Sequence, residues 1–294
     1  MEPTLQELSQ GRRYFQHGPI DIIAYAEGDA ASVARAHEAA WYRFGQILPE
    51  LVCELTELRR PVLCPVALKG PIAQLMWQAC KDCLIEADSE AFLTPMAAVA
   101  GSVAQDLSAC YQVPGIRRAW LNNGGDIALY LTEDTAVSVG LFADLARFDE
   151  TQLVAGVQTD AVFEVRHGMG IGGIATSGWR GRSFSLGIAD SVTVFAASAS
   201  QADAAATVIA NAVNVVDARI GREPAATLKD DSDLGQRLVT VAVPELSQEQ
   251  VRSALEAGLK KAHTLRQNGL ICASVLSCQG WFVSTETNRI QRLS

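Results

Sequence analysis

The chain has 294 residues, of which 49% are hydrophobic and 19% charged, so it can bury a large core in one or two compact parts. A net charge of -9 without any Lys/Arg block argues against nucleic acid as the main partner, because phosphate binding needs a basic footprint. The first residues show no basic and apolar leader pattern, and no apolar run is long enough to span a bilayer. We therefore expect a cytoplasmic protein with no membrane partner.

The seven cysteines are an odd number, which favours packing thiols in a reducing compartment over a disulfide framework. Cys80 and Cys83 form one Cys-x-x-Cys pair. A structural zinc site usually needs a second pair of ligands nearby, and the sequence offers none. We expect both cysteines to pack in the core, with a metal or redox role as the alternative.

The first third of the chain predicts one strand and four helices after a loose or short helical lead-in over 1–13. The strand is expected at 17–26, and the helices at 29–48, 50–58, 72–84 and 96–109. Asp29 is the N-cap candidate of the first helix. Pro49 is expected to end that helix and to start the next, because proline removes a helical hydrogen bond.

Strands dominate the remainder, and two helices interrupt them. The strands are expected at 117–121, 127–131, 135–141, 161–166, 191–196, 237–243, 271–278 and 281–285, and the helices at 201–219 and 247–267. Small polar residues predict loops over 173–183 and 222–234. A strand, a short polar loop and a helix recur three times. This favours an α+β fold in one domain over 1–294, with two pseudo-repeated α/β halves around mixed sheets.

A strong turn signal lies between two of the predicted strands, at Asn123, Gly124, Gly125 and Asp126. Two glycines allow backbone to approach a ligand closely, and the Asp126 carboxylate can accept from a ribose hydroxyl or a ring N–H. This indicates a cofactor-binding turn. A plain hairpin explains the same residues equally well.

A second polar segment concentrates hydroxyls, glycine and basic groups at Thr176, Ser177, Gly178, Arg180 and Arg182. Hydroxyl and backbone N–H groups can surround a phosphate, and arginine can bind it in bidentate fashion. The segment therefore indicates anion binding, with a solvated loop as the alternative. The preceding glycines are not a P-loop, because no Gly-Lys-Ser/Thr follows them.

Asp203 and Thr207 lie four residues apart in a predicted helix, so their side chains share one face. A carboxylate and a hydroxyl are hard oxygen ligands of the kind that suits Mg²⁺, which keeps water and phosphate oxygens at its other positions. The alternative is an early helical Asp that complements the helix dipole, beside an ordinary Thr.

Taken in chain order, these motifs resemble the ApbE family of FAD:protein FMN transferases. The family pattern has a Gly-Gly-Asp turn, a Thr/Ser-Ser-Gly loop followed by Arg, a Ser-Val-Thr-Val strand, and Ala-Asp-Ala-x-x-Thr at a helix start. The matching segments are 124–126, 176–182, 191–194 and 202–207. The clearest match covers 92–217, and the chain is most similar to a divergent ApbE-like branch.

The resemblance implies an ApbE-like fold and a Mg²⁺ ion on Asp203 and Thr207, which would be both metal ligands and catalytic residues. It also implies a backbone carbonyl ligand near 101–103. FAD would be the substrate, bound by the turn and by the Thr-Ser-Gly segment. A Thr hydroxyl of an acceptor protein would receive FMN, and AMP would leave.

The chain departs from the family pattern over 183–190, where the family carries a His-x-x-Asp-Pro segment and this chain has neither His nor Pro. Two interpretations follow: a flavin-handling transferase, or a protein without transferase activity that binds a phosphorylated ligand or serves another cofactor pathway. The acceptor protein and the assembly, a homo-oligomer included, are left open by the sequence.

Overall fold

The computed structural model describes residues 2–84, 92–141, 143–144 and 160–292. Contacts divide the chain into two compact units that interleave along the sequence. Unit 1 comprises Met1–Val137, Val165–Ala175 and Phe195–Ala204, and unit 2 comprises Ser138–Glu164, Thr176–Val194 and Ala205–Ser294. Five elements start in one unit and end in the other: β6 (Ala136–Leu141), β7 (Ala161–Arg166), β8 (Gly173–Ser177), β9 (Ser191–Ala196) and α6 (Ala199–Ala212).

Unit 1 contains a sheet of antiparallel neighbours in the order β1-β2-β3-β4-β5-β8. Its further strands are β1 (Thr4–Glu7), β2 (Arg13–His17), β3 (Ile20–Gly28), β4 (Ile116–Asn123) and β5 (Asp126–Leu131). Its helices are α1 (Ala30–Cys53), α2 (Leu55–Leu58), α3 (Pro71–Cys83) and α4 (Val99–Ser108), with short 3-10 turns η1 (Ser9–Gly11), η2 (Pro95–Ala98) and η3 (Ala109–Tyr111). Buried residues of α1, α3 and α4 share one hydrophobic core with β2, β3, β4 and β5.

Helix α1 begins where the sequence predicts but does not end there. Asp29 caps it by accepting a hydrogen bond from the backbone N–H of Ser32 at 2.9 Å. Pro49 lies inside the helix, so the prediction of a break there was wrong; the predicted second helix exists but is shorter, as α2 over Leu55–Leu58 instead of 50–58. The buried stripe continues to Leu51, and packing of that stripe offsets the hydrogen bond that proline removes.

The predicted lead-in over 1–13 was also wrong, because it contains strand β1 and the start of β2. All four residues of β1 are exposed, so they show none of the alternation by which a half-buried strand is recognised. The prediction for Cys80 and Cys83 was right: both lie buried in α3.

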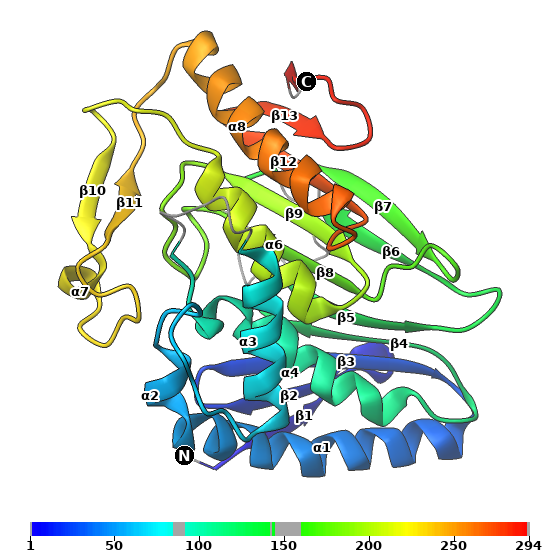
Figure 1. Ribbon diagram of the computed structural model, residues 1–294. Helices are drawn as coiled ribbons and strands as arrows, with labels where there is room; N and C mark the ends of the chain where they lie inside the picture. Colours follow the sequence, from blue (N-terminus) through cyan, green and yellow to red (C-terminus); the bar gives the residue numbers. More distant parts are fainter. Residues whose placement is uncertain (1, 85–91, 142, 145–159, 293–294) are drawn as a thin grey trace. The chain divides into compact units, whose positions relative to one another are not determined.

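Unit 2 contains the strand order β9-β12-β13-β14 and a separate antiparallel pair, β10 with β11. Its elements are β10 (Gly221–Pro224), α7 (Ala225–Leu228), β11 (Leu238–Ala242), α8 (Gln248–Gln267), β12 (Ala273–Cys278), β13 (Trp281–Ser284) and β14 (Gln291–Arg292). Helix α8 packs on β12 and β13 (Figure 1). At its start, Ser247 and Gln250 form a reciprocal capping box.

Three predictions in this part of the chain need correction. Residues 173–177 form strand β8, whereas a loop was expected over 173–183. Helix α6 ends at Ala212, whereas the predicted helix ran to residue 219. Soon after that end, Asn214 accepts from the backbone N–H of Val215, a local bond that competes with helical pairing. The loop expected over 222–234 contains most of β10 and all of α7.

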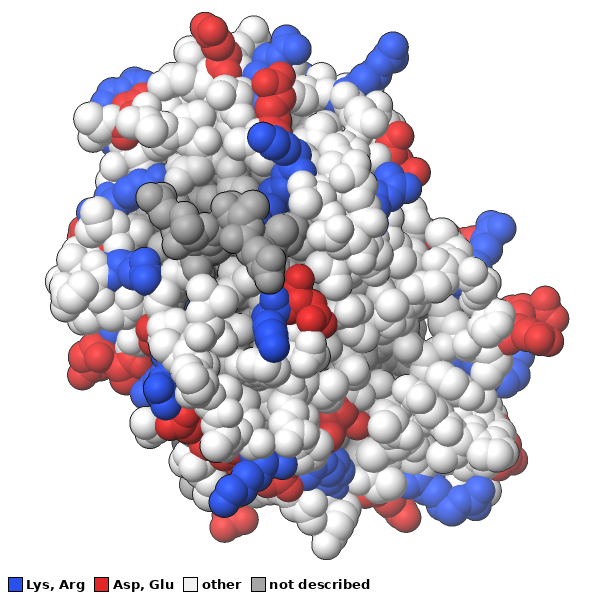
Figure 2. Space-filling model, viewed as in Figure 1, with Lys and Arg blue, Asp and Glu red and all other residues white. Residues whose placement is uncertain are grey.

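The α+β class is confirmed, whereas the pseudo-repeat and the single-domain assignment stay predictions. Among the described residues, no helix combines the length and apolar character that a membrane crossing requires. Acidic and basic side chains are interspersed over the face drawn in Figure 2.

Candidate functional site

The Asn-Gly-Gly-Asp turn is a two-residue hairpin between β4 and β5. Asn123 pairs with Asp126 across the two strands, and the loop residues Gly124 and Gly125 have φ values of 64° and 114°. Positive φ at both loop positions is the geometry of the tight hairpin turns that favour glycine. Asn122 supports the turn by accepting from the backbone N–H of Gly125 at 2.8 Å. The segment is therefore a hairpin turn with Asp126 as the first residue of β5, and its role in cofactor binding stays a prediction.

Asp203 lies half-buried on α6 and points at the first turn of α4. Its Oδ2 accepts from the backbone N–H of Gly101 at 2.9 Å. Gly101 has no room for a side chain, because a Cβ there would overlap the Ala199 carbonyl oxygen and the Cβ of Asp203. The close approach of α4 to the start of α6 therefore brings this carboxylate to a helix N-terminus, where backbone N–H groups favour a negative charge.

Asp203 also lies within the electrostatic reach of the hairpin. Burial raises the pKa of Asp203 well above its usual range, and the charge of Asp126 raises this pKa further. Hydrogen bonds from the backbone N–H groups of Gly101 and Ala100 act in the opposite direction but do not cancel the shift. Two carboxylates from distant parts of the chain thus repel each other in a half-buried place.

Asn123 joins the hairpin to α4. Its Nδ2 donates to the Ala100 carbonyl oxygen at 3.0 Å, and the Asn123 side chain is buried. The resemblance had implied a carbonyl ligand near 101–103, and that assignment stays a prediction. The Ala100 carbonyl next to the hairpin is a site group that sequence reasoning missed.

Thr207 follows Asp203 by one turn on α6 and is half-buried. Side chains at this spacing lie on the same helix face. Its role as a metal ligand stays a prediction.

The donor chemistry of these residues fits Mg²⁺ better than a metal held by protein alone. Across the described parts of the chain, no three His, Cys, Asp or Glu side chains gather as a metal-binding group. Mg²⁺ typically takes one or two carboxylates and completes its shell with water and phosphate oxygens. The repulsion between Asp126 and Asp203 is the feature that a bound cation would relieve.

The Thr-Ser-Gly residues lie at the end of β8, and their contacts are with the segment that leads into β9. The Thr176 hydroxyl lies 2.9 Å from the Thr193 hydroxyl. A Cβ at Gly178 would come within 2.6 Å of the Asp190 carbonyl oxygen, so glycine is needed there for packing. Ser177 is half-buried at the last position of the strand.

The two predicted arginines differ in their surroundings. Arg180 forms an ion pair with Asp144 at 2.9 Å, and its guanidinium carbon lies 4.7 Å from the ring centre of Trp179. Arg182 is exposed. The roles of both arginines in cofactor binding stay predictions, and Arg180 would have to exchange Asp144 for a phosphate.

The structure therefore brings the hairpin and Asp203 together at α4, within unit 1, and brings Thr176, Gly178 and Arg180 together near the start of β9, within unit 2. These observations define an α+β protein that sets two acidic side chains, Asp126 and Asp203, near a glycine hairpin. The chain matches the family model described as "AbpE bacteria" over residues 5–285, and it belongs to that family. The resemblance to the ApbE family is thereby confirmed.

Relatives of known sequence include proteins named UPF0280. One, from Methanothermobacter thermautotrophicus, is 38% identical over 180 residues, which cover 61% of this chain and 63% of the relative. Another, from Methanococcus maripaludis strain C7, is 42% identical over 128 residues, which cover 44% of this chain and 49% of the relative. The chain thus spans between about half and slightly under two thirds of the length of these curated relatives.

The solved structures that this chain matches include the ApbE protein of Thermotoga maritima, with a TM-score of 0.44 and 11% sequence identity. That comparison covers 99% of this chain and 96% of the other. The apo form of the Pseudomonas stutzeri flavinyl transferase ApbE gives a TM-score of 0.43 and 12% identity, covering 97% and 94% of the two chains. The family assignment rests on the family model.

Proposed function

We propose that the protein is a Mg²⁺-dependent enzyme that binds FAD and transfers FMN to a Thr hydroxyl of an acceptor protein, with release of AMP. The observation that carries this proposal is the Asp203 carboxylate, held at the first turn of α4 by the Gly101 N–H and within the electrostatic reach of Asp126 in the glycine hairpin. Membership of the family supports it. In the reaction a bond forms between the Thr oxygen and the phosphorus of FMN, while the bond from that phosphorus to the AMP phosphate breaks.

Asp203 and Thr207 would hold the ion, and Asp126 would add the second negative charge. A Mg²⁺ ion supplies charge neutralisation at phosphate oxygens and fixes their orientation. The hairpin glycines allow the backbone to approach the nucleotide, and Asn123 holds the hairpin in place through the Ala100 carbonyl. The cofactor-binding roles of Thr176, Ser177, Gly178, Arg180 and Arg182 stay sequence-based predictions within this proposal.

The test is to incubate the purified protein with FAD and Mg²⁺, with water as the acceptor in place of the Thr hydroxyl, and to follow release of AMP and FMN by chromatography. We expect AMP release that stops when EDTA is added, and Asp203→Asn to lower the rate by about two orders of magnitude or more, since the ion would lose a carboxylate. Asp134→Asn is the matched control, because Asp134 is an exposed aspartate whose positive φ asparagine also tolerates. Absence of both FAD binding and AMP release would contradict the proposal.

A second candidate is a protein that binds a phosphorylated ligand, or serves another cofactor pathway, without transferring FMN. Segment 183–190, which has no His, favours it. Asn211 fixes this segment by accepting from the backbone N–H of Leu186 at 2.9 Å and from the Ser185 hydroxyl at 3.2 Å. Mg²⁺-dependent binding of FAD or another nucleotide, measured by calorimetry without AMP release, would favour this candidate.

A further inference from the structure

Unit 2 contains a polar cavity with a volume of about 150 Å³. Its lining consists of Ala143, Asp144, Arg180, Asp190, Ser277, Gln279 and Gly280. A water molecule takes up roughly 30 Å³ in the liquid, so the cavity has room for several waters or for a small organic molecule. It is larger than a bare metal ion requires.

Asp190 is the buried charge of this cavity, with only 6% of its surface exposed. One carboxylate oxygen accepts from the indole N–H of Trp179 at 3.2 Å, and the other accepts from the backbone N–H of Gln279. Each oxygen keeps a second lone pair for a further donor. Burial raises the pKa of Asp190, and the nearby charge of Asp144 raises this pKa too, so the ionised carboxylate lacks full compensation within the protein.

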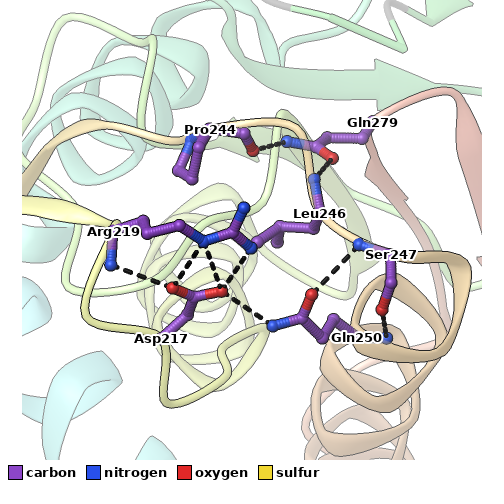
Figure 3. A network of polar contacts seen from close by, with 7 residues as sticks. All are labelled: Asp217, Arg219, Pro244, Leu246, Ser247, Gln250 and Gln279. Carbon is purple, nitrogen blue, oxygen red and sulfur yellow. Dashed lines mark hydrogen bonds and ion pairs between the residues drawn. The ribbon is translucent and has the colours of Figure 1, made fainter.

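Gln279 forms a rigid wall of the cavity. It lies in the β12–β13 turn with a φ of 46°, a conformation that non-glycine residues rarely adopt. Its side-chain amide donates to the Pro244 carbonyl at 2.6 Å and accepts from the backbone N–H of Leu246 at 3.0 Å (Figure 3). Such strain persists only where surrounding contacts fix it, and it is common at binding sites.

The side chain of Gln279 binds the segment from Pro244 to Leu246, and a second set of contacts fixes this segment. Asp217 pairs with Arg219 at 2.7 Å and accepts from the Gln250 side chain at 2.8 Å, at the first turn of α8 (Figure 3). Ser247, which follows the loop, accepts from the backbone N–H of Gln250. The turn that carries Gln279 is therefore supported before any ligand arrives, which lowers the entropic cost of binding.

Ser277 supplies an unused polar group in the cavity wall. Only 2% of its surface is exposed, and its hydroxyl has no hydrogen-bond partner among the residues that the structure describes. A buried hydroxyl left in this state costs about 1–3 kcal/mol. A ligand with an N–H donor would satisfy the Ser277 oxygen and Asp190 together.

The charges of the lining residues determine whether a cation or an anion would bind in the cavity. Among the described lining residues, Arg180 is paired with Asp144 and packed on the Trp179 ring, so Asp190 carries the excess negative charge. An anion would meet two carboxylates, whereas a cation would restore the balance.

We propose that this cavity binds a small organic cation with N–H donors, an ammonium or amidinium group, which donates to Asp190 and Ser277. The site lies entirely in unit 2 and shares Arg180 with the predicted nucleotide site, but cation binding at Asp190 and Ser277 does not depend on FMN transfer.

The test uses the indole N–H of Trp179 as a reporter, because it donates directly to Asp190. Spectra of the ¹⁵N-labelled protein are recorded with propylammonium and acetamidinium, and Trp179→Phe assigns the reporter signal. Matched neutral and anionic probes are 1-propanol, acetamide and propionate. We expect saturable shifts with the two cations at a Kd on the order of 1 mM, because small ligands gain limited free energy for each atom. Equal shifts with the neutral probes, or saturable shifts with propionate alone, would overturn the proposal.

Amino-acid substitutions test whether the cations bind in this cavity. We expect Ser277→Ala to weaken cation binding about 5- to 10-fold, through loss of one hydrogen bond, and Asp190→Asn to weaken it by roughly 10-fold or more. Ser274→Ala is the matched control, because Ser274 is a buried serine on the same strand whose hydroxyl has no partner among the described residues, and it does not line the cavity. An equal effect of Ser274→Ala and Ser277→Ala would contradict the site. If circular dichroism shows that Asp190→Asn is unfolded, the comparison of Ser277→Ala with Ser274→Ala tests the site without it.

Discussion

His37 is a titratable side chain held in the core of unit 1, with 5% of its surface exposed. Its Nδ1 lies 2.8 Å from the Tyr111 hydroxyl, and its Nε2 has no partner in the described parts of the chain. Burial lowers the pKa of His37 from 6.5 to about 4, because the charged ring would lose its hydration. His37 is therefore neutral in the folded protein near pH 6.

This shift predicts acid sensitivity. A histidine whose pKa is lower in the folded state contributes stability above pH 6.5, and this stability is lost as the pH falls toward 4. We expect a loss of up to about 3 kcal/mol in the free energy of unfolding over that window, measured by urea denaturation. His37→Gln should flatten this part of the profile, although it lowers stability at pH 7. An unchanged slope between pH 6.5 and 4 would show that another group is responsible.

The repulsion between Asp126 and Asp203 predicts opposite effects of one substitution. A carboxyl whose folded pKa is raised loses stability as the pH rises through that pKa, so removing the neighbouring charge should stabilise the metal-free protein at pH 7. We expect Asp126→Asn to raise Tm in EDTA, by about 2–4 °C for each kcal/mol, and to reduce the further rise on addition of Mg²⁺. Calorimetry with and without Mg²⁺ measures both. A lower Tm in EDTA would mean that Asp126 has a mainly structural role.

At the scale of elements, the contact of α4 with the start of α6 depends on Gly101. Gly101→Ala would place a Cβ against the Ala199 carbonyl and displace Asp203, so we expect a loss of about 1–3 kcal/mol. Gly45→Ala is the matched helical control, since the nearest atom to its added Cβ would lie at an ordinary 3.8 Å. It should stabilise α1 by about 0.5–1 kcal/mol. Urea denaturation of both variants checks the contrast, and two substitutions of equal sign would refute it.

Most elements could be predicted from periodicity and caps, and the exceptions have physical causes. Asp29 and Ser247 mark helix starts by local chemistry, which one sequence contains in full. The break predicted at Pro49 was wrong because the tertiary packing of α1 outweighs the local cost of a proline in the helix. Strand β1 shows no burial pattern at all. Local signals therefore identified most helices and strands, and they failed where packing outweighs a local cost, as at Pro49, or where burial leaves no pattern, as in β1.

The candidate site also contains features that the sequence predicts and features that depend on tertiary packing. The hairpin at Gly124 and Gly125 and the spacing of Asp203 and Thr207 are local, so the sequence predicted them. The approach of Asp126 to Asp203 depends on the packing of α4, which no spacing rule contains. The Gly101 N–H and the Ala100 carbonyl were missed because backbone groups leave no mark in a sequence.

At the scale of the whole molecule, the interleaved units predict cooperative unfolding. Strands β8 and β9 and helix α6 each contribute residues to both units, so neither unit can unfold without breaking elements that the other uses. We expect far-UV circular dichroism and tryptophan fluorescence to give coincident urea transitions. Two separated transitions would show that the units unfold independently.

The close contact of Gly101 with α6 also constrains the order in which a nascent chain can fold. Gly101 and Asp203 are 102 positions apart, so a ribosome working at about 5–20 residues per second separates their emergence by roughly 5–20 seconds. Throughout that interval the first turn of α4 lacks both the carboxylate that binds it and the backbone that packs on it. The hairpin can close early, but the acidic pair forms only after about two thirds of the chain has been synthesised. A cation or a nucleotide can therefore stabilise only the late stages of folding.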